Sequence, residues 1–152
     1  MQVQRIAIGP ADAVGALPQS GYAVAFEVSR PATDARSPEQ WARAVWEQAP
    51  PPVRRLLLVG WRIGLGLRLG PPDTASHVLG WVLTSTTGRA AVLDARSRLM
   101  TARNVVELRG TRVRWTTFVR FDRRPAGTLW FLAARVHHVM IPYLLRRAAT
   151  HG

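Results

Sequence analysis

The chain lacks cysteine and lysine altogether, and asparagine occurs once, at Asn104. Without cysteine it has no disulfide framework, no thiolate nucleophile and no cysteine-based zinc site. Its 152 residues fit one domain, residues 1–152, and a chain of this length buries roughly 70% of its unfolded surface. The hydrophobic content of 47% is too high for a disordered basic tail.

The absence of lysine affects how the charge is interpreted. All 21 basic residues are arginine, and with 9 acidic residues they give a formal net charge of +12. Abundant arginine, alanine, glycine and proline are typical of a GC-rich coding sequence whatever the function of the protein. The charge alone therefore does not identify a partner. Nucleic acid, an anionic membrane and an acidic ligand all stay open as alternatives.

Long uninterrupted apolar runs are also missing. The two most apolar stretches are Leu56–Leu69 and Leu129–Leu145, and arginines interrupt both. Neither offers the ~18 consecutive apolar residues of a membrane span. The segment Met1–Pro10 has neither the basic start nor the apolar run of a signal peptide. We therefore expect a soluble cytoplasmic protein.

The first half of the chain predicts a strand followed by two short helices. Tyr22–Val28 alternates apolar with small or charged residues, which is typical of a strand. Ser37 precedes a proline and stands three residues before Gln40, a pattern that predicts a capped helix start. The run Pro50–Pro52 ends that helix. Val53–Arg62 is interpreted as a second helix.

The next fifty residues predict an antiparallel sheet whose strands are 77–86, 90–98, 103–109 and 112–121. Gly110 and Thr111 form a two-residue turn of the type II′ kind between the last two strands. This turn places Glu107 opposite Arg114 and Val106 opposite Trp115. One face is then apolar, and the other has arginines around one glutamate. A slip of one residue would bury the arginines, so the register is well specified.

A long helix from Thr128 to about Ala149 ends the chain. Its predicted apolar face consists of Leu129, Leu132, Ala133, Val136, Val139, Met140, Tyr143 and Leu144. The order is a strand, two helices, an antiparallel meander and one long helix. It predicts an α+β fold in which a curved sheet wraps around the C-terminal helix. A leftover apolar cavity between sheet and helix is a natural ligand site.

This order resembles the helix-grip fold of the START-related (SRPBCC) superfamily, which includes lipid binders and polyketide cyclases. The segments Gly21–Val28, Pro38–Arg43 and Val136–Ala148 resemble a bacterial family of unknown function within it. The resemblance spans nearly the whole chain, but none of its segments is a catalytic signature. It implies a cavity that binds a small hydrophobic or amphipathic molecule, such as a lipid or a polyketide-like compound.

The candidate ligand-binding residues come from the apolar sheet face and from the long helix. They are Trp81, Val106, Trp115, Thr117, His137, Met140 and Tyr143. Of the two adjacent histidines, His137 is preferred as the polar group in the cavity. Adjacent helical residues point about 100° apart, so His137 and His138 cannot chelate one metal ion. We therefore expect no metal and no cofactor.

Two other classes of function stay open. One is an enzyme of the cyclase or isomerase kind that uses His137 in the cavity, with Tyr143 as a second polar group. The other is an interaction module on the arginine-rich sheet face, formed by Arg96, Arg98, Arg103, Arg109, Arg112, Arg114 and Arg120.

Two anionic partners were considered for the basic surface. RNA-binding sheets interleave exposed aromatic residues, and only Phe118 does so here, which argues against nucleic acid. The arginines within and just before Leu56–Leu69 suggest instead a peripheral contact with an anionic membrane.

Overall fold

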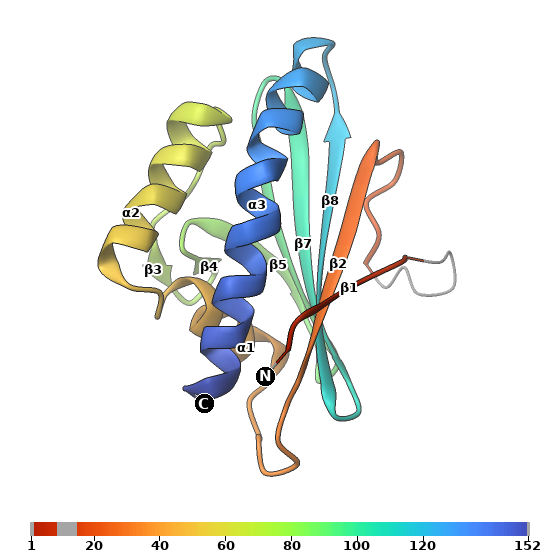
Figure 1. Ribbon diagram of the computed structural model, residues 1–152. Helices are drawn as coiled ribbons and strands as arrows, with labels where there is room; N and C mark the ends of the chain where they lie inside the picture. The colour runs from red at the N-terminus through yellow and green to blue at the C-terminus, as the bar shows by residue number, and fades with distance from the viewer. Residues whose placement is uncertain (1, 9–14, 152) are drawn as a thin grey trace.

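The computed structural model describes residues 2–8 and 15–151, which form one antiparallel sheet and three α-helices (Figure 1). The elements are β1 (Gln4–Ile6), β2 (Tyr22–Ser29), α1 (Pro38–Trp46), α2 (Pro51–Val59), the π-helical η2 (Gly60–Gly64), β3 (Asp73–Thr74), β4 (His77–Val78), β5 (Trp81–Thr86), β6 (Ala90–Arg96), β7 (Met100–Arg109), β8 (Arg112–Phe121) and α3 (Pro125–Thr150). The strands lie in the order β1-β2-β8-β7-β6-β5-β4-β3. The sheet curves around α3, so the expected α+β helix-grip fold is confirmed.

The predicted capped helix start is confirmed at α1. The backbone nitrogen of Gln40 donates to Oγ of Ser37, and the backbone nitrogen of Ser37 donates to Oε1 of Gln40. Trp41 and Val45 on the inner side of α1 are buried, so this helix packs into the core. The two short helices follow β2 rather than the first strand, because β1 precedes them along the chain.

The predicted hairpin register is confirmed at β7 and β8. Arg109 pairs with Arg112, and Val106 pairs with Trp115. Gly110 has a φ of +59°, whereas Thr111 is not among the residues with positive φ, as a type II′ turn requires. Val106 and Trp115 are fully buried, so this face of the hairpin belongs to the core.

The predicted strand 77–86 was wrong, because the chain turns sharply within it. Leu79 has a φ of +45° and Gly80 a φ of +91°, which separates β4 from β5. A Cβ at Gly80 would lie 2.8 Å from Cβ of Leu69, so this position also needs glycine for space. The apolar residues on both sides of Gly80 made the segment resemble one continuous strand.

The arginine-rich face is less exposed than predicted. Arg114, Thr116 and Phe118 are buried. Phe118 packs with Leu17 in a small second core, which is formed by Leu17, Ala90, Val92, Val105 and Phe118. The chain segment before β2 therefore covers part of a face that was expected to meet solvent.

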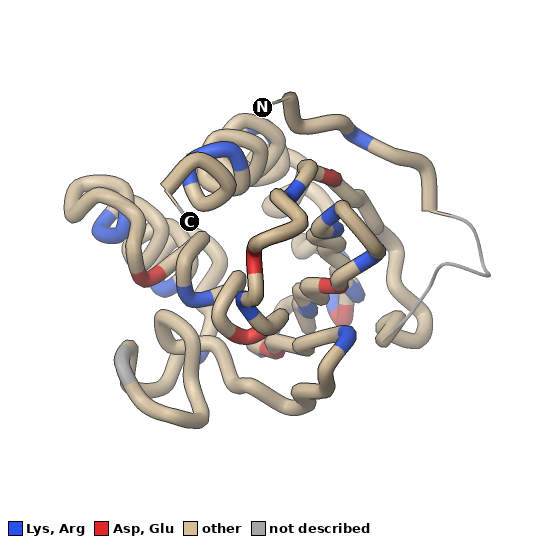
Figure 2. The backbone as a smooth tube through the Cα atoms, turned by 90° about the horizontal axis from the view of Figure 1, so that it is seen from below, with Lys and Arg blue, Asp and Glu red and all other residues tan. Residues whose placement is uncertain are grey.

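Ion pairs neutralise much of the charge on this face. Arg114 pairs with Glu27 of β2 at 2.8 Å, although the hairpin register places it opposite Glu107. Further ion pairs on this face join Arg112 to Glu27, Arg103 to Asp94, Arg120 to Asp122 and Arg109 to Glu107. Figure 2 shows acidic positions of the backbone lying among the arginine positions.

The predicted start of α3 was wrong, and its predicted apolar face is buried only in part: Leu144 is buried and Leu129, Ala133 and Met140 pack against the core. The helix begins at Pro125 rather than Thr128, because proline fits the first turn, where a backbone N–H has no helical partner. Its buried residues are Ala126, Trp130, Ala134, Ile141, Leu144, Leu145, Ala148 and Ala149. Four apolar side chains of the predicted buried face are exposed instead, namely Leu132, Val136, Val139 and Tyr143.

The described residues contain no helix with both the length and the hydropathy needed to cross a membrane.

Candidate functional site

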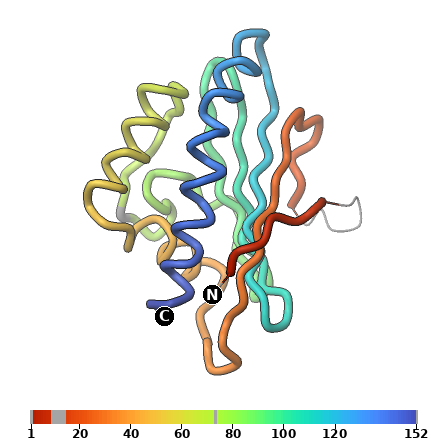
Figure 3. Tube along the Cα trace, in the orientation of Figure 1, coloured from red at the N-terminus to blue at the C-terminus, as the bar shows by residue number. Residues whose placement is uncertain are grey.

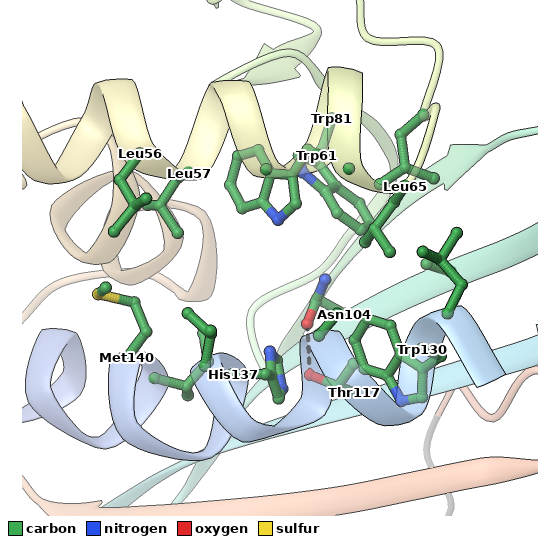
Figure 4. Close-up of a pocket in the computed structure, with 18 of the residues that line it drawn as sticks. Leu56, Leu57, Trp61, Leu65, Trp81, Asn104, Thr117, Trp130, His137 and Met140 are labelled. Atoms are coloured by element: carbon green, nitrogen blue, oxygen red, sulfur yellow. Dashed lines mark hydrogen bonds between the residues drawn. The ribbon is translucent and has the colours of Figure 1, made fainter. Parts of the chain in front are cut away.

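An apolar cavity of about 320 Å³ lies between the sheet, the α2–η2 segment and α3 (Figure 4). The sheet contributes Trp81, Ala102, Asn104 and Thr117 to its lining, and α1 contributes Trp46. The other lining residues are Leu56, Leu57, Gly60, Trp61, Gly64, Leu65, Leu67, Leu129, Trp130, Leu132, Ala133, Val136, His137, Met140 and Ile141. No charged side chain is among the described residues of this lining.

The α2–η2 segment forms the side of the cavity that faces α3. It starts at the triple proline, and none of its residues is fully buried. Leu56, Leu57 and Trp61 point from it toward the cavity, and Figure 3 shows the segment beside α3. The helix widens at η2, where the backbone nitrogen of Leu65 donates to the carbonyl of Gly60 at 2.9 Å.

Tryptophans form one wall of the cavity. The ring centroids of Trp46 and Trp61 lie 4.8 Å apart, and Trp81 lies 5.3 Å from Trp46 and 5.5 Å from Trp61. These contacts are edge-to-face or tilted, as aromatic quadrupoles prefer. Four of the six tryptophans line the cavity, since Trp130 joins these three from α3.

A hydrogen-bonded polar group from the sheet lies beside this wall. Oδ1 of Asn104 accepts from Oγ of Thr117 at 2.6 Å and from the indole nitrogen of Trp115 at 2.9 Å. All three residues are buried. The indole nitrogen can only donate, so the Asn104 atom facing it must be the oxygen. The amide nitrogen of Asn104 is therefore turned toward the tryptophan wall, as Figure 4 shows.

His137 faces the cavity from α3. Its Nε2 atom is buried and has no hydrogen-bond partner among the described residues. Burial, and to a smaller degree the neighbouring His138, lowers the pKa of His137 to about 3. The imidazole is therefore neutral near pH 7, with one nitrogen that donates and one that accepts.

His138 points to the sheet instead. Its Nε2 atom forms a hydrogen bond with the hydroxyl of Tyr22 on β2, and the two rings stack. Burial, followed by the charge of Arg5, lowers its pKa, and burial raises the pKa of Tyr22. The ring centroids of His137 and His138 lie 6.3 Å apart. The two adjacent histidines thus have separate surroundings.

Four of the seven residues proposed from the sequence line the cavity, and three do not. Trp81, Thr117, His137 and Met140 belong to the lining. Val106 and Trp115 are fully buried in the core behind it, and Tyr143 is exposed on α3.

Sequence reasoning missed Asn104, Trp46 and the leucines of α2. Asn104 had a recognisable signal, because it is a polar residue on the apolar sheet face, directly opposite Thr117.

Exposed apolar side chains lie on the two helical segments that border the cavity, and we call them the apolar rim. They are Leu56, Val59 and Ile63 on α2–η2 and Leu132, Val136 and Val139 on α3. Their exposed fractions run from 52% to 80%, high for large apolar residues on a functionally inert surface. The exposed arginines 55, 62 and 135 lie next to rim residues along the chain.

Comparisons of the chain with protein-family models, curated proteins and solved structures give no match.

Proposed function

We propose that this protein binds a small hydrophobic or amphipathic molecule in the cavity between the sheet, α2–η2 and α3. The observation that supports this most directly is the cavity itself, with its volume of about 320 Å³ and its apolar lining. Small-molecule sites have volumes of roughly 300–1,000 Å³ and a few polar groups among apolar walls. Asn104, Thr117 and His137 are the polar groups here.

The exposure of α2–η2 also supports the proposal. A helix that buries none of its residues leaves its leucines partly in water, at a cost of roughly 25 cal/mol per Å² of apolar surface. A ligand in the cavity would cover Leu57 and Trp61 and would stabilise the segment. We further propose that the chain is related to the START-related superfamily, which the helix-grip arrangement supports.

A fluorescent probe tests the proposal. N-phenyl-1-naphthylamine is neutral and apolar, and its emission rises on entry into an apolar site. We expect saturable binding with a stoichiometry of one and quenching of tryptophan emission, because four tryptophans line the cavity. Native mass spectrometry of the purified protein should also reveal any copurifying ligand. Absence of both probe binding and a retained molecule would contradict the proposal.

The apolar rim favours a second candidate function, which is contact of the cavity mouth with an anionic membrane. Apolar side chains on two neighbouring helices, with arginines beside them in sequence, suit the boundary between headgroups and acyl chains. The net charge of +12 adds a long-range attraction to an anionic surface. Such a contact would bring the cavity mouth to a supply of apolar ligands.

A further inference from the structure

The orientation of Asn104 determines which polar atoms the cavity presents. Oδ1 of Asn104 is used by two donors, Thr117 and Trp115. Its two amide N–H groups have no hydrogen-bond partner among the described residues and point toward the tryptophan wall. This amide nitrogen is reachable from the cavity rather than sealed in the core, so a ligand atom that accepts a hydrogen bond can satisfy it there.

The lack of charged side chains in the lining restricts which ligands the cavity can bind. None of the described lining residues is charged. The one titratable side chain among them is His137, which is neutral near pH 7 because its pKa is about 3. A carboxylate or phosphate inside the cavity would lose its hydration and find no cation there, which is strongly unfavourable.

We propose that the cavity selects uncharged ligands with a carbonyl oxygen, which accepts a hydrogen bond from the amide nitrogen of Asn104. This inference rests on the proposed function and specifies its ligand class. The apolar body of the ligand lies between the tryptophan wall and the leucines of α2. Ketones, esters and amides of apolar molecules belong to this class, and ionised fatty acids do not.

A series of ligands with the same number of carbon atoms tests the inference. Undecane, undecan-2-one and undecanoate are compared at pH 8 by displacement of N-phenyl-1-naphthylamine. We expect undecan-2-one to bind about fivefold to tenfold more tightly than undecane, since one hydrogen bond is gained. Ionised undecanoate should bind at least about tenfold more weakly than the ketone, because its charge is unpaired in the cavity.

Two variants locate the preference. Asn104→Leu removes the amide N–H groups and should abolish the preference for undecan-2-one over undecane, because the buried carbonyl then has no donor. Thr116→Val is the matched control, because Thr116 is the neighbouring buried threonine on the opposite face of β8 and does not line the cavity, and it should keep the preference. Melting curves establish that each variant is folded. Should Asn104→Leu fail to fold, the ligand series on the wild-type protein decides alone.

The possible failures are distinguishable. If neither the probe nor any ligand binds, the proposed function itself is wrong. If the probe binds but undecane and undecan-2-one compete equally, the carbonyl preference is overturned while binding stands. If undecanoate competes as well as the ketone at pH 8, a cation outside the lining, such as an arginine near the rim, pairs with it, and selection of uncharged ligands is overturned.

Discussion

The indole nitrogen of Trp115 donates a 2.9 Å hydrogen bond to Oδ1 of Asn104, and this contact orients the only asparagine of the chain. Trp115 is therefore not a wall of the cavity but a buried support behind it. Because an indole N–H has no acceptor function, the contact turns the amide nitrogen of Asn104 away from the core. The polarity of the cavity thus depends on a residue that does not line it.

The first prediction concerns the stability of this network. Asn104→Leu should lower the free energy of unfolding by about 2–4 kcal/mol, because the N–H of Trp115 and the hydroxyl of Thr117 lose their acceptor while buried. Thr117→Val should cost only about 1 kcal/mol, because the bond between Trp115 and Asn104 remains. Urea denaturation followed by tryptophan fluorescence measures both values. Equal costs for the two variants would contradict the proposed role of Asn104 as a shared acceptor.

The second prediction concerns pH. His137 has a pKa of about 3 in the folded protein and about 6.5 in an unfolded chain. The unfolded state therefore binds the proton first, and the stabilisation present above pH 6.5 is lost progressively as the pH falls toward 3. Between pH 7 and 5.5 we expect a loss of about 1 kcal/mol from this residue. Denaturant unfolding at both pH values measures it.

The matched variants for this titration are His137→Gln and His138→Gln. His137→Gln should remove most of the loss between pH 7 and 5.5. The pKa of His138 is also lowered, so His138→Gln removes a contribution of the same sign and leaves that of His137 in place. Aspartates with lowered pKa values, such as Asp34, titrate below this window. An unchanged pH dependence in His137→Gln would show that this histidine is not buried in the folded protein.

The third prediction fills the cavity. Ala133 lines the cavity from α3, so Ala133→Trp should place an indole ring inside it and weaken N-phenyl-1-naphthylamine binding by at least about tenfold. Val139→Trp is the control, because Val139 is on the same helix, is exposed and does not line the cavity. It should bind the probe as the wild type does. Similar effects of both variants would place the probe outside the cavity.

The fourth prediction tests the apolar rim on membranes. The protein should sediment with phosphatidylcholine vesicles that contain phosphatidylglycerol, and more weakly with phosphatidylcholine alone. The double variant Ile63→Ser, Val139→Ser should reduce this binding several-fold, because both side chains are exposed rim residues. Val82→Ser changes an exposed valine on β5 and serves as the control. If added salt abolishes vesicle binding and the rim variant still binds as the wild type does, the protein adsorbs by charge alone.

The fifth prediction concerns the buried ion pair on the outer sheet face. Glu27→Gln should destabilise the fold by about 3 kcal/mol, because the buried guanidinium of Arg114 loses the carboxylate of Glu27. Asp122→Asn breaks the pair with Arg120, whose members are both partly exposed, and should cost less than about 1 kcal/mol. Thermal and urea unfolding compare the two. A small effect at Glu27 would show that this pair is hydrated.

Strands and their register were predictable where two strands that follow each other in the sequence also pair in the sheet. A two-residue turn at Gly110 sets every pair along β7 and β8, so the alternating pattern alone was sufficient. The break at Leu79 and Gly80 was missed although Gly80 is a local turn signal, because the turn also needs a positive φ at Leu79, which a leucine rarely adopts. The pairing of Arg114 with Glu27 needed the placement of β2 beside β8, which local patterns do not contain.

The candidate site was predicted only in part, because local patterns show which residues share a face but not which elements cover that face. The pair His137 and His138 was conspicuous as polar residues in an apolar helix, and the preference for His137 came from the resemblance to the helix motif of the family. In the fold, His137 lines the cavity and His138 contacts Tyr22 on the sheet. Trp115 and Val106 share the correct sheet face with Asn104 and Thr117, yet α1 and its Trp46 cover that part of the face. Only the docking of α1 decides which part of an apolar face becomes core and which part borders the cavity.

The sequence by itself determined the α+β class, the capped start of α1, the register of the last hairpin and the presence of a long apolar C-terminal helix. Each of these depends on contacts within one or two adjacent elements, where turn chemistry and periodicity suffice. The tertiary structure decided which side of α3 is buried, because that helix is apolar on more than one side. It also decided that α2 is only partly buried against the core, that much of the arginine charge on the outer sheet face is paired, and that the amide of Asn104 faces the cavity. These features depend on contacts between distant segments, whose energies no local pattern encodes.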